Sequence, residues 1–156
     1  MVGCTARVTE VVRRYDDGRL DILTCGQRPF EIHFTDDEKP YLRGAVTYLE
    51  DDDPEPPPDV DAKQAWSLFR EVMKRLAPAA SPADSPPDCQ QLSFRISAAL
   101  PLGIEFKQQV LALHSERERI RLLTHLMEKL IPALDLRERT RSKASGNGHI
   151  TRLKGS

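Results

Sequence analysis

The chain has 156 residues and a mass of 17.6 kDa; 39% of its residues are hydrophobic and 30% are charged. This length suits one modest domain and is too short for a two-domain enzyme. A formal net charge of −1 excludes a strong overall field that would draw the protein onto nucleic acid or anionic lipid. The three cysteines are widely spaced and no apolar segment follows the initial methionine. We therefore expect a cytoplasmic protein with neither a disulfide scaffold nor a membrane span.

The first part of the chain predicts a β-hairpin. Residues 3–34 are rich in Val, Thr, Ile, Leu and Phe, and the turn-forming sequence Asp-Asp-Gly at residues 16–18 interrupts them. A third strand is expected over residues 41–49, after a proline that needs to donate no ladder hydrogen bond. The stretch 36–61 contains ten acidic and two basic residues, and its prolines predict a solvated linker at residues 54–60.

Helices are predicted after the linker, and we assign residues 61–136 to a helical subdomain. Asp61 is expected to cap the first helix, along which apolar residues recur at the spacing of one buried helix face. A short helix is expected over residues 90–99, because the residue before Pro101 is pushed out of the helical region. A further helix is expected to begin near Ile104.

The last predicted helix is the longest. Ser115 and Glu118 have the spacing of a capping box at its start, and a stripe of apolar residues continues to an expected end near Leu136. Arg119, beside this stripe, is expected to face water. Residues 137–156 carry six basic residues and one acidic residue, so we expect a disordered basic tail. Strands followed by helices predict the α+β class.

No motif for catalysis or metal binding is recognisable in the sequence. The eight glycines form no phosphate-binding loop, and the four histidines lie outside any nucleophile motif. No Cys-x-x-Cys pair typical of a zinc site is present. Across the hairpin we expect Cys4 to pair near Phe30 and Cys25 near Thr9, and we interpret both cysteines as buried small hydrophobic residues. We therefore expect no cofactor and no metal.

Several segments resemble, in order, the substrate-binding domain of Lon proteases, which also occurs as a free-standing bacterial protein. Residues 2–8 resemble the family's Gly-Thr-x-Ala-Arg-Ile strand, and residues 17–20 resemble its Asp-Gly-Arg hairpin. Residues 26–32 are similar to its Gly-x-x-Arg-Phe-x-Ile segment, although Pro29 stands where the family usually has arginine. Residues 40–46 are similar to its Pro-Tyr-Leu-x-Ala-x-Val strand.

The helical part carries the best-matching segments of this resemblance. Residues 100–102, 105–108 and 116–119 resemble the family's Leu-Pro-Leu, Glu-x-Lys-Gln and Glu-Glu-Arg motifs, so that the resemblance extends over residues 2–136. The chain begins at a strand from the middle of the family's β-barrel. We therefore expect either a start codon farther upstream, which we favour, or a partner that supplies the missing strands.

The resemblance implies a partial PUA-like β-barrel of three or more antiparallel strands at residues 1–53, followed by a helical bundle. It further implies a non-catalytic module that recognises exposed hydrophobic or unfolded polypeptide, as an adaptor or chaperone-like protein. Such polypeptides are the expected partners, and an ATP-dependent protease is a further candidate partner. Because Lon's ATPase and Ser-Lys peptidase motifs are absent from the sequence, we expect no enzymatic activity.

A bound peptide is expected to lie along a strand edge or in an apolar groove, where main-chain hydrogen bonds give affinity and side-chain pockets give preference. Large apolar side chains are the candidate contacts, and each is about three times more often part of a core. These candidates are Phe30, Ile32, Phe34, Tyr41 and Trp66. The alternatives are a PUA-like RNA-binding module and a truncated, non-functional gene product. RNA is disfavoured, because the basic tail has no aromatic residue on which bases could stack.

Overall fold

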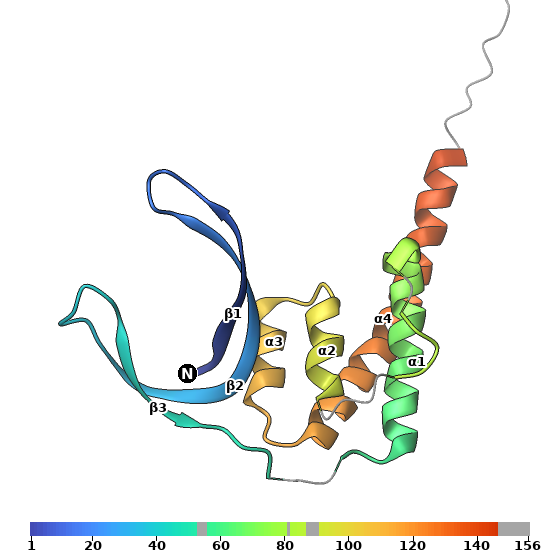
Figure 1. The fold of residues 1–156 in the computed structure, drawn as a ribbon. Coiled ribbons are helices and arrows are strands. Elements are labelled where there is room, and N and C mark those ends of the chain that lie inside the picture. The colour runs from blue at the N-terminus through green and yellow to red at the C-terminus, as the bar shows by residue number, and fades with distance from the viewer. Residues whose placement is uncertain (53–55, 81, 87–90, 147–156) are drawn as a thin grey trace, which may run out of the picture. The chain divides into compact units, whose positions relative to one another are not determined.

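The computed structural model describes residues 1–52, 56–80, 82–86 and 91–146. In this part of the chain three antiparallel strands come first and four α-helices follow, which confirms the α+β class (Figure 1). The elements are β1 (Val2–Arg14), β2 (Leu20–Asp36), β3 (Arg43–Tyr48), α1 (Asp59–Leu76), the 3-10 helix η1 (Pro78–Ala80), α2 (Leu92–Ala99), α3 (Ile104–Ala112) and α4 (Glu116–Gly146).

The chain divides into two compact units, each made from two separate segments. The sheet unit comprises Met1–Pro56 and Pro101–Glu118, and the helical unit comprises Pro57–Leu100 and the chain from Arg119 onward. This division differs from the expected boundaries, because α3 belongs with the strands. It packs against β1, and the chain after it returns to the sheet unit's linker, where the Asp52 N–H donates to the carbonyl of His114 at 2.7 Å.

The tight turn of the hairpin is confirmed at residues 16–18. Gly18 has φ of +87°, in the left-handed region that favours glycine, and its N–H donates to the carbonyl of Tyr15 at 3.0 Å. The Asp17 carboxylate accepts a hydrogen bond from the Arg19 N–H at 3.1 Å. Beside the turn, the Tyr15 hydroxyl donates to Asp21 at 2.8 Å, and this hydrogen bond raises the pKa of the phenol.

Three irregularities shift the register between β1 and β2, between Cys4 and Ala6 and at two later points. Cys4 therefore pairs with Pro29, one residue from the expected Phe30, and Cys25 pairs with Arg7, two residues from the expected Thr9. Both cysteines are exposed, so their interpretation as buried residues was wrong. Bulges of this kind bend a sheet. The β1–β2 ribbon is strongly curved, and α3 lies beside its outer side (Figure 1).

The helical unit has a hydrophobic core. Trp66 is at its edge, with 8% of its surface exposed, and the indole N–H donates to the carbonyl of Ala83 at 2.9 Å. Its ring centroid lies 5.0 Å from that of Phe69. The predicted apolar stripe of α1 is thus confirmed as a buried face. The core residues of this unit are Ala65, Trp66, Phe69, Val72, Leu92, Ile96, Leu100, Ile120, Leu123 and Met127.

Arg119 is buried in the helical unit, contrary to the expectation that it faces water. Only 1% of its surface is exposed. Its Nε donates to the Ser93 hydroxyl at 3.1 Å, and the guanidinium carbon lies 4.6 Å from the centroid of the Phe94 ring. A hydroxyl and an aromatic face compensate part of the cost of removing the guanidinium from water. A helical arginine next to a core stripe can therefore belong to the core.

The last helix, α4, is longer than expected. It begins directly after Ser115, whose hydroxyl accepts the Glu118 N–H at 3.4 Å, as one half of the predicted capping box. It continues through Pro132 to Gly146, ten residues beyond the expected end. Residues 137–146 are helical where a disordered tail was predicted, because arginine, glutamate and lysine are good helix formers even when they have no core to cover. The remaining tail, residues 147–156, lies outside the described residues.

Candidate functional site

The sheet of the sheet unit has two edges that no described strand pairs. The strand order is β1-β2-β3, so β2 is central, and β1 and β3 each present one free side. The edge of β1 runs along 13 residues and that of β3 along six. Backbone N–H and C=O groups on such an edge can form a ladder with an extended peptide.

One face of this sheet carries an apolar cluster. Phe30 lies opposite Tyr48, and Ile32 lies opposite Val46. Residues directly opposite each other, and residues two apart on one strand, share a face of the sheet. The four side chains therefore lie on the same side, and we call them the apolar face. The rings of Phe30 and Tyr48 meet edge to face, with their centroids 6.4 Å apart and an interplanar angle of 89°.

Two neighbouring residues fix the aromatic part of the apolar face. Gly3 lies opposite Phe30 on β1, and a Cβ at this glycine would lie 2.7 Å from the nearest atom of the Phe30 ring. The ring can therefore lie directly over the β1 backbone only because residue 3 has no side chain. On the other side, the Arg28 guanidinium carbon is 3.9 Å from the centroid of the Tyr48 ring. This contact places a cation at the margin of the apolar face.

The five predicted contact residues are in different surroundings. Phe30 and Ile32 are half-buried on the apolar face, and Phe34 follows across a register shift with 65% of its surface exposed. Tyr41, 64% exposed, is in the link between β2 and β3. Trp66 belongs to the core of the helical unit and is 8% exposed, so its ring offers little open contact surface. The structure brings together Phe30 and Ile32, and the expectation of a core position holds for Trp66 alone.

Sequence reasoning missed three members of the site. Val46 and Tyr48 lie in the predicted third strand, and their role follows only from the register that pairs them with Ile32 and Phe30. The spacing of Val46 and Tyr48, two positions apart in an expected strand, was a usable signal, but it could not identify the partners across the sheet. Arg28 had no recognisable signal, because its contact with the Tyr48 ring depends on the position of β3 relative to β2.

The described residues offer little basis for other kinds of site. Among the residues that the structure describes, no group of three His, Cys, Asp or Glu side chains is placed to hold a metal ion. His33 is hydrogen-bonded to the Thr47 hydroxyl at 2.8 Å across the sheet. In the same part of the chain, no helix is long and apolar enough to cross a membrane. The apolar face and the two free strand edges form the candidate site.

A curved sheet followed by helices is also the fold of a solved relative. The crystal structure of a Lon N-terminal domain protein from Xanthomonas campestris is similar to this chain, with a TM-score of 0.55 and 20% sequence identity over 78% of this chain and 65% of that chain. The chain thus spans 65% of the length of that relative, and a likeness at this identity shows the fold alone. No curated protein matches the chain.

The family follows from the sequence match. The family model of the ATP-dependent protease La (LON) substrate-binding domain matches residues 1–129, and the chain belongs to this family. The resemblance seen in the sequence motifs is thereby confirmed. The matching part of that family is its substrate-binding domain.

Proposed function

We propose that the chain is a non-catalytic recognition module that binds exposed hydrophobic segments of unfolded polypeptides. It would act as an adaptor or chaperone-like protein in the cytoplasm, from which an ATP-dependent protease takes over the bound polypeptide. Membership of the Lon substrate-binding family supports the substrate-binding part of this proposal. The preference for hydrophobic segments is supported by the apolar face, which lies beside the unpaired edge of β3.

The geometry suggests how a peptide would bind. A segment added alongside β3 would form backbone hydrogen bonds with the free edge of that strand. Every second side chain of the segment would then project onto the same side as Val46 and Tyr48. Main-chain hydrogen bonds contribute affinity whatever the peptide sequence, whereas contacts with the apolar face strengthen the binding of peptides that have apolar side chains at alternate positions. The module would therefore prefer extended, alternating hydrophobic segments, which folded proteins keep buried.

Binding of a labelled, permanently unfolded polypeptide tests this proposal. Reduced and carboxymethylated lactalbumin serves as the probe, and fluorescence anisotropy gives its affinity. We expect Val46→Asp to weaken binding by about tenfold or more, because a peptide bound there would cover an unpaired carboxylate. Phe34→Ala and Tyr41→Ala then measure how far the site extends past the apolar face, since both side chains are largely exposed.

The matched control is Val60→Asp, which makes the same change on an exposed valine of α1. It should leave the affinity unchanged, while circular dichroism shows that both variants are folded. A folded Val46→Asp variant that binds the unfolded probe as tightly as the parent protein would contradict the proposed site.

A further inference from the structure

The helical unit contains a groove of a different chemical character. It lies where α1 ends and α4 continues past it, and it encloses about 280 Å³. Six residues line it, none of them aromatic: Arg75, Leu76, Leu134, Arg137, Glu138 and Arg141. We call it the α1–α4 groove.

One wall of the α1–α4 groove is fixed by a charge network. The Arg75 Nε is 2.6 Å from Asp135 Oδ1, and its Nη2 is 3.0 Å from Glu71 Oε1. The hydrogen bond from Arg75 lowers the pKa of the Asp135 carboxyl and raises the pKa of the guanidinium. Arg75 is therefore held in place and already neutralised by two carboxylates. It shapes the groove but offers little charge to a ligand.

The other wall carries free positive charge. Arg137 and Arg141 are four residues apart on α4, which places them on the same side of the helix. Both are exposed, and neither makes an ion pair with any residue that the structure describes. Glu138 is the single acidic residue in the lining. The unpaired groups of the groove therefore leave a net positive charge.

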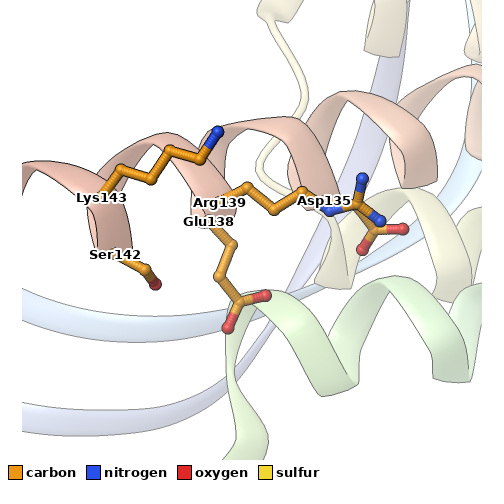
Figure 2. A pocket seen from close by; sticks show the side chains of 5 residues that line it. All are labelled: Asp135, Glu138, Arg139, Ser142 and Lys143. Carbon is orange, nitrogen blue, oxygen red and sulfur yellow. The ribbon is translucent and has the colours of Figure 1, made fainter.

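Two other basic residues of α4, Arg139 and Lys143, lie outside the α1–α4 groove on the adjoining surface. Asp135, Glu138, Arg139, Ser142 and Lys143 line a second depression (Figure 2). The charge of Arg139 helps to lower the pKa of Asp135, after the larger effect of Arg75, while the Lys143 ammonium extends away from Glu138 (Figure 2). The charge of Arg139 is partly compensated, so Arg137 and Arg141 are the arginines best placed to receive a ligand.

The α1–α4 groove also has an apolar component. Leu76 is 39% exposed at the end of α1, and Leu134 is half-buried one turn before Arg137. A ligand that matches the groove needs carboxylates spaced for two arginines and an apolar side chain beside them. Carboxylates form two parallel hydrogen bonds with a guanidinium, which makes arginine the preferred partner. Single-stranded nucleic acid matches less well, because the groove has no ring on which a base could stack.

We propose that the α1–α4 groove binds an acidic segment of a partner protein, with carboxylates on Arg137 and Arg141 and an apolar side chain on Leu76 and Leu134. This site lies within the helical unit and is separate from the apolar face of the sheet unit. The module would then hold two kinds of polypeptide: an unfolded client on the sheet, and a partner with an acidic docking segment on the helices.

The test uses the full chain and two labelled peptides of the same pattern. One has glutamates at positions i and i+4 with leucines between them, and the other has lysines in place of the glutamates. At low salt, anisotropy should show binding of the acidic peptide only. The double variant Arg137→Ala/Arg141→Ala should weaken this binding by about tenfold, since two exposed ion pairs are removed. The variant Arg137→Glu/Arg141→Glu should instead bind the lysine peptide.

Two controls separate this site from general charge and from the sheet. Arg121→Ala removes another exposed arginine of α4 and should leave acidic-peptide binding unchanged. At a salt concentration that abolishes binding of the acidic peptide, binding of the unfolded probe to the apolar face should survive both arginine variants, so that each proposal can fail alone. The inference is overturned if the folded double variant binds the acidic peptide as the parent does, if both peptides bind equally, or if labelled oligouridylate binds in preference to the acidic peptide.

Discussion

The helical unit and the strands of the sheet unit differ in how far their apolar side chains are buried. In the helical unit, Val72, Leu123 and Met127 are completely removed from solvent. In the strands of the sheet unit no residue is fully buried, and Val8 and Leu23 are among many large apolar side chains left half exposed. Burial of apolar side chains stabilises the packing of the helices, whereas backbone hydrogen bonds and the hairpin turn hold the described strands together. Exposed apolar surface of this extent is typical of interaction sites.

The aromatic residues give each unit its own optical signal. The single tryptophan, Trp66, is in the core of the helical unit. All three tyrosines, Tyr15, Tyr41 and Tyr48, are in the sheet unit. Tryptophan fluorescence therefore follows the unfolding of the helices, and tyrosine fluorescence follows that of the sheet. The contrast between the units can be tested on one sample.

The largest effect is expected in the helical core. Leu123→Ala removes a completely buried side chain, and the cavity left behind should lower the free energy of unfolding by about 2–5 kcal/mol. Urea titration monitored by tryptophan fluorescence measures it. Leu23→Ala, in β2, is the matched change on a half-exposed leucine. It should lower the free energy of unfolding of the sheet unit, measured by tyrosine fluorescence, by about 0.5 kcal/mol or less. Equal losses in the two units would mean that the sheet unit has a buried core of its own.

A smaller effect is expected at the edge of the helical core. Trp66→Phe keeps an aromatic ring beside Phe69 but removes the indole N–H that reaches the Ala83 carbonyl. The free energy of unfolding should fall by about 1 kcal/mol, the usual net value of one hydrogen bond. Circular dichroism at the helical wavelengths replaces fluorescence for this variant. Unchanged stability would show that the bond contributes nothing beyond the packing of the ring.

The smallest effect concerns the response to acid. Because the native pKa of Asp135 lies below its ordinary value, the native state binds fewer protons than the unfolded state as the pH falls. The stabilisation is complete above the ordinary aspartate range and is lost as the pH falls through the lowered native pKa. In Asp135→Asn this loss should be absent, so stability of the helical unit should depend less steeply on pH in acid. The partly exposed position of the pair keeps the effect modest.

Local patterns in the sequence predicted much of the fold. The Asp-Asp-Gly turn was predictable because only a residue such as Gly18 accepts a positive φ cheaply. The start of α4 was predictable because the Ser115 hydroxyl caps a neighbouring N–H. The buried face of α1 followed from helical periodicity. Each of these features depends on residues only a few positions apart.

What the sequence could not show depends on distant partners. Tyr48 lies opposite Phe30 in a sheet whose strand pairing contains several register shifts. No local sequence pattern predicts where such shifts occur. Arg119 is buried because Ser93 and Phe94 come from another helix to meet it. The helical state of residues 137–146 was missed for a different reason: their charged composition favours solvation, but their individual propensities favour a helix.

The interleaving of the two units has a consequence for how the chain folds during synthesis. The strands are synthesised before the helices, but α3, which completes the sheet unit, follows only after α1 and α2 have been made. Closing the sheet unit therefore encloses residues 57–100 of the helical unit as a loop, and the entropy of that closure must be overcome. Until then the nascent strands display their apolar side chains without α3, which makes this early stage the point at which a chaperone would be needed most.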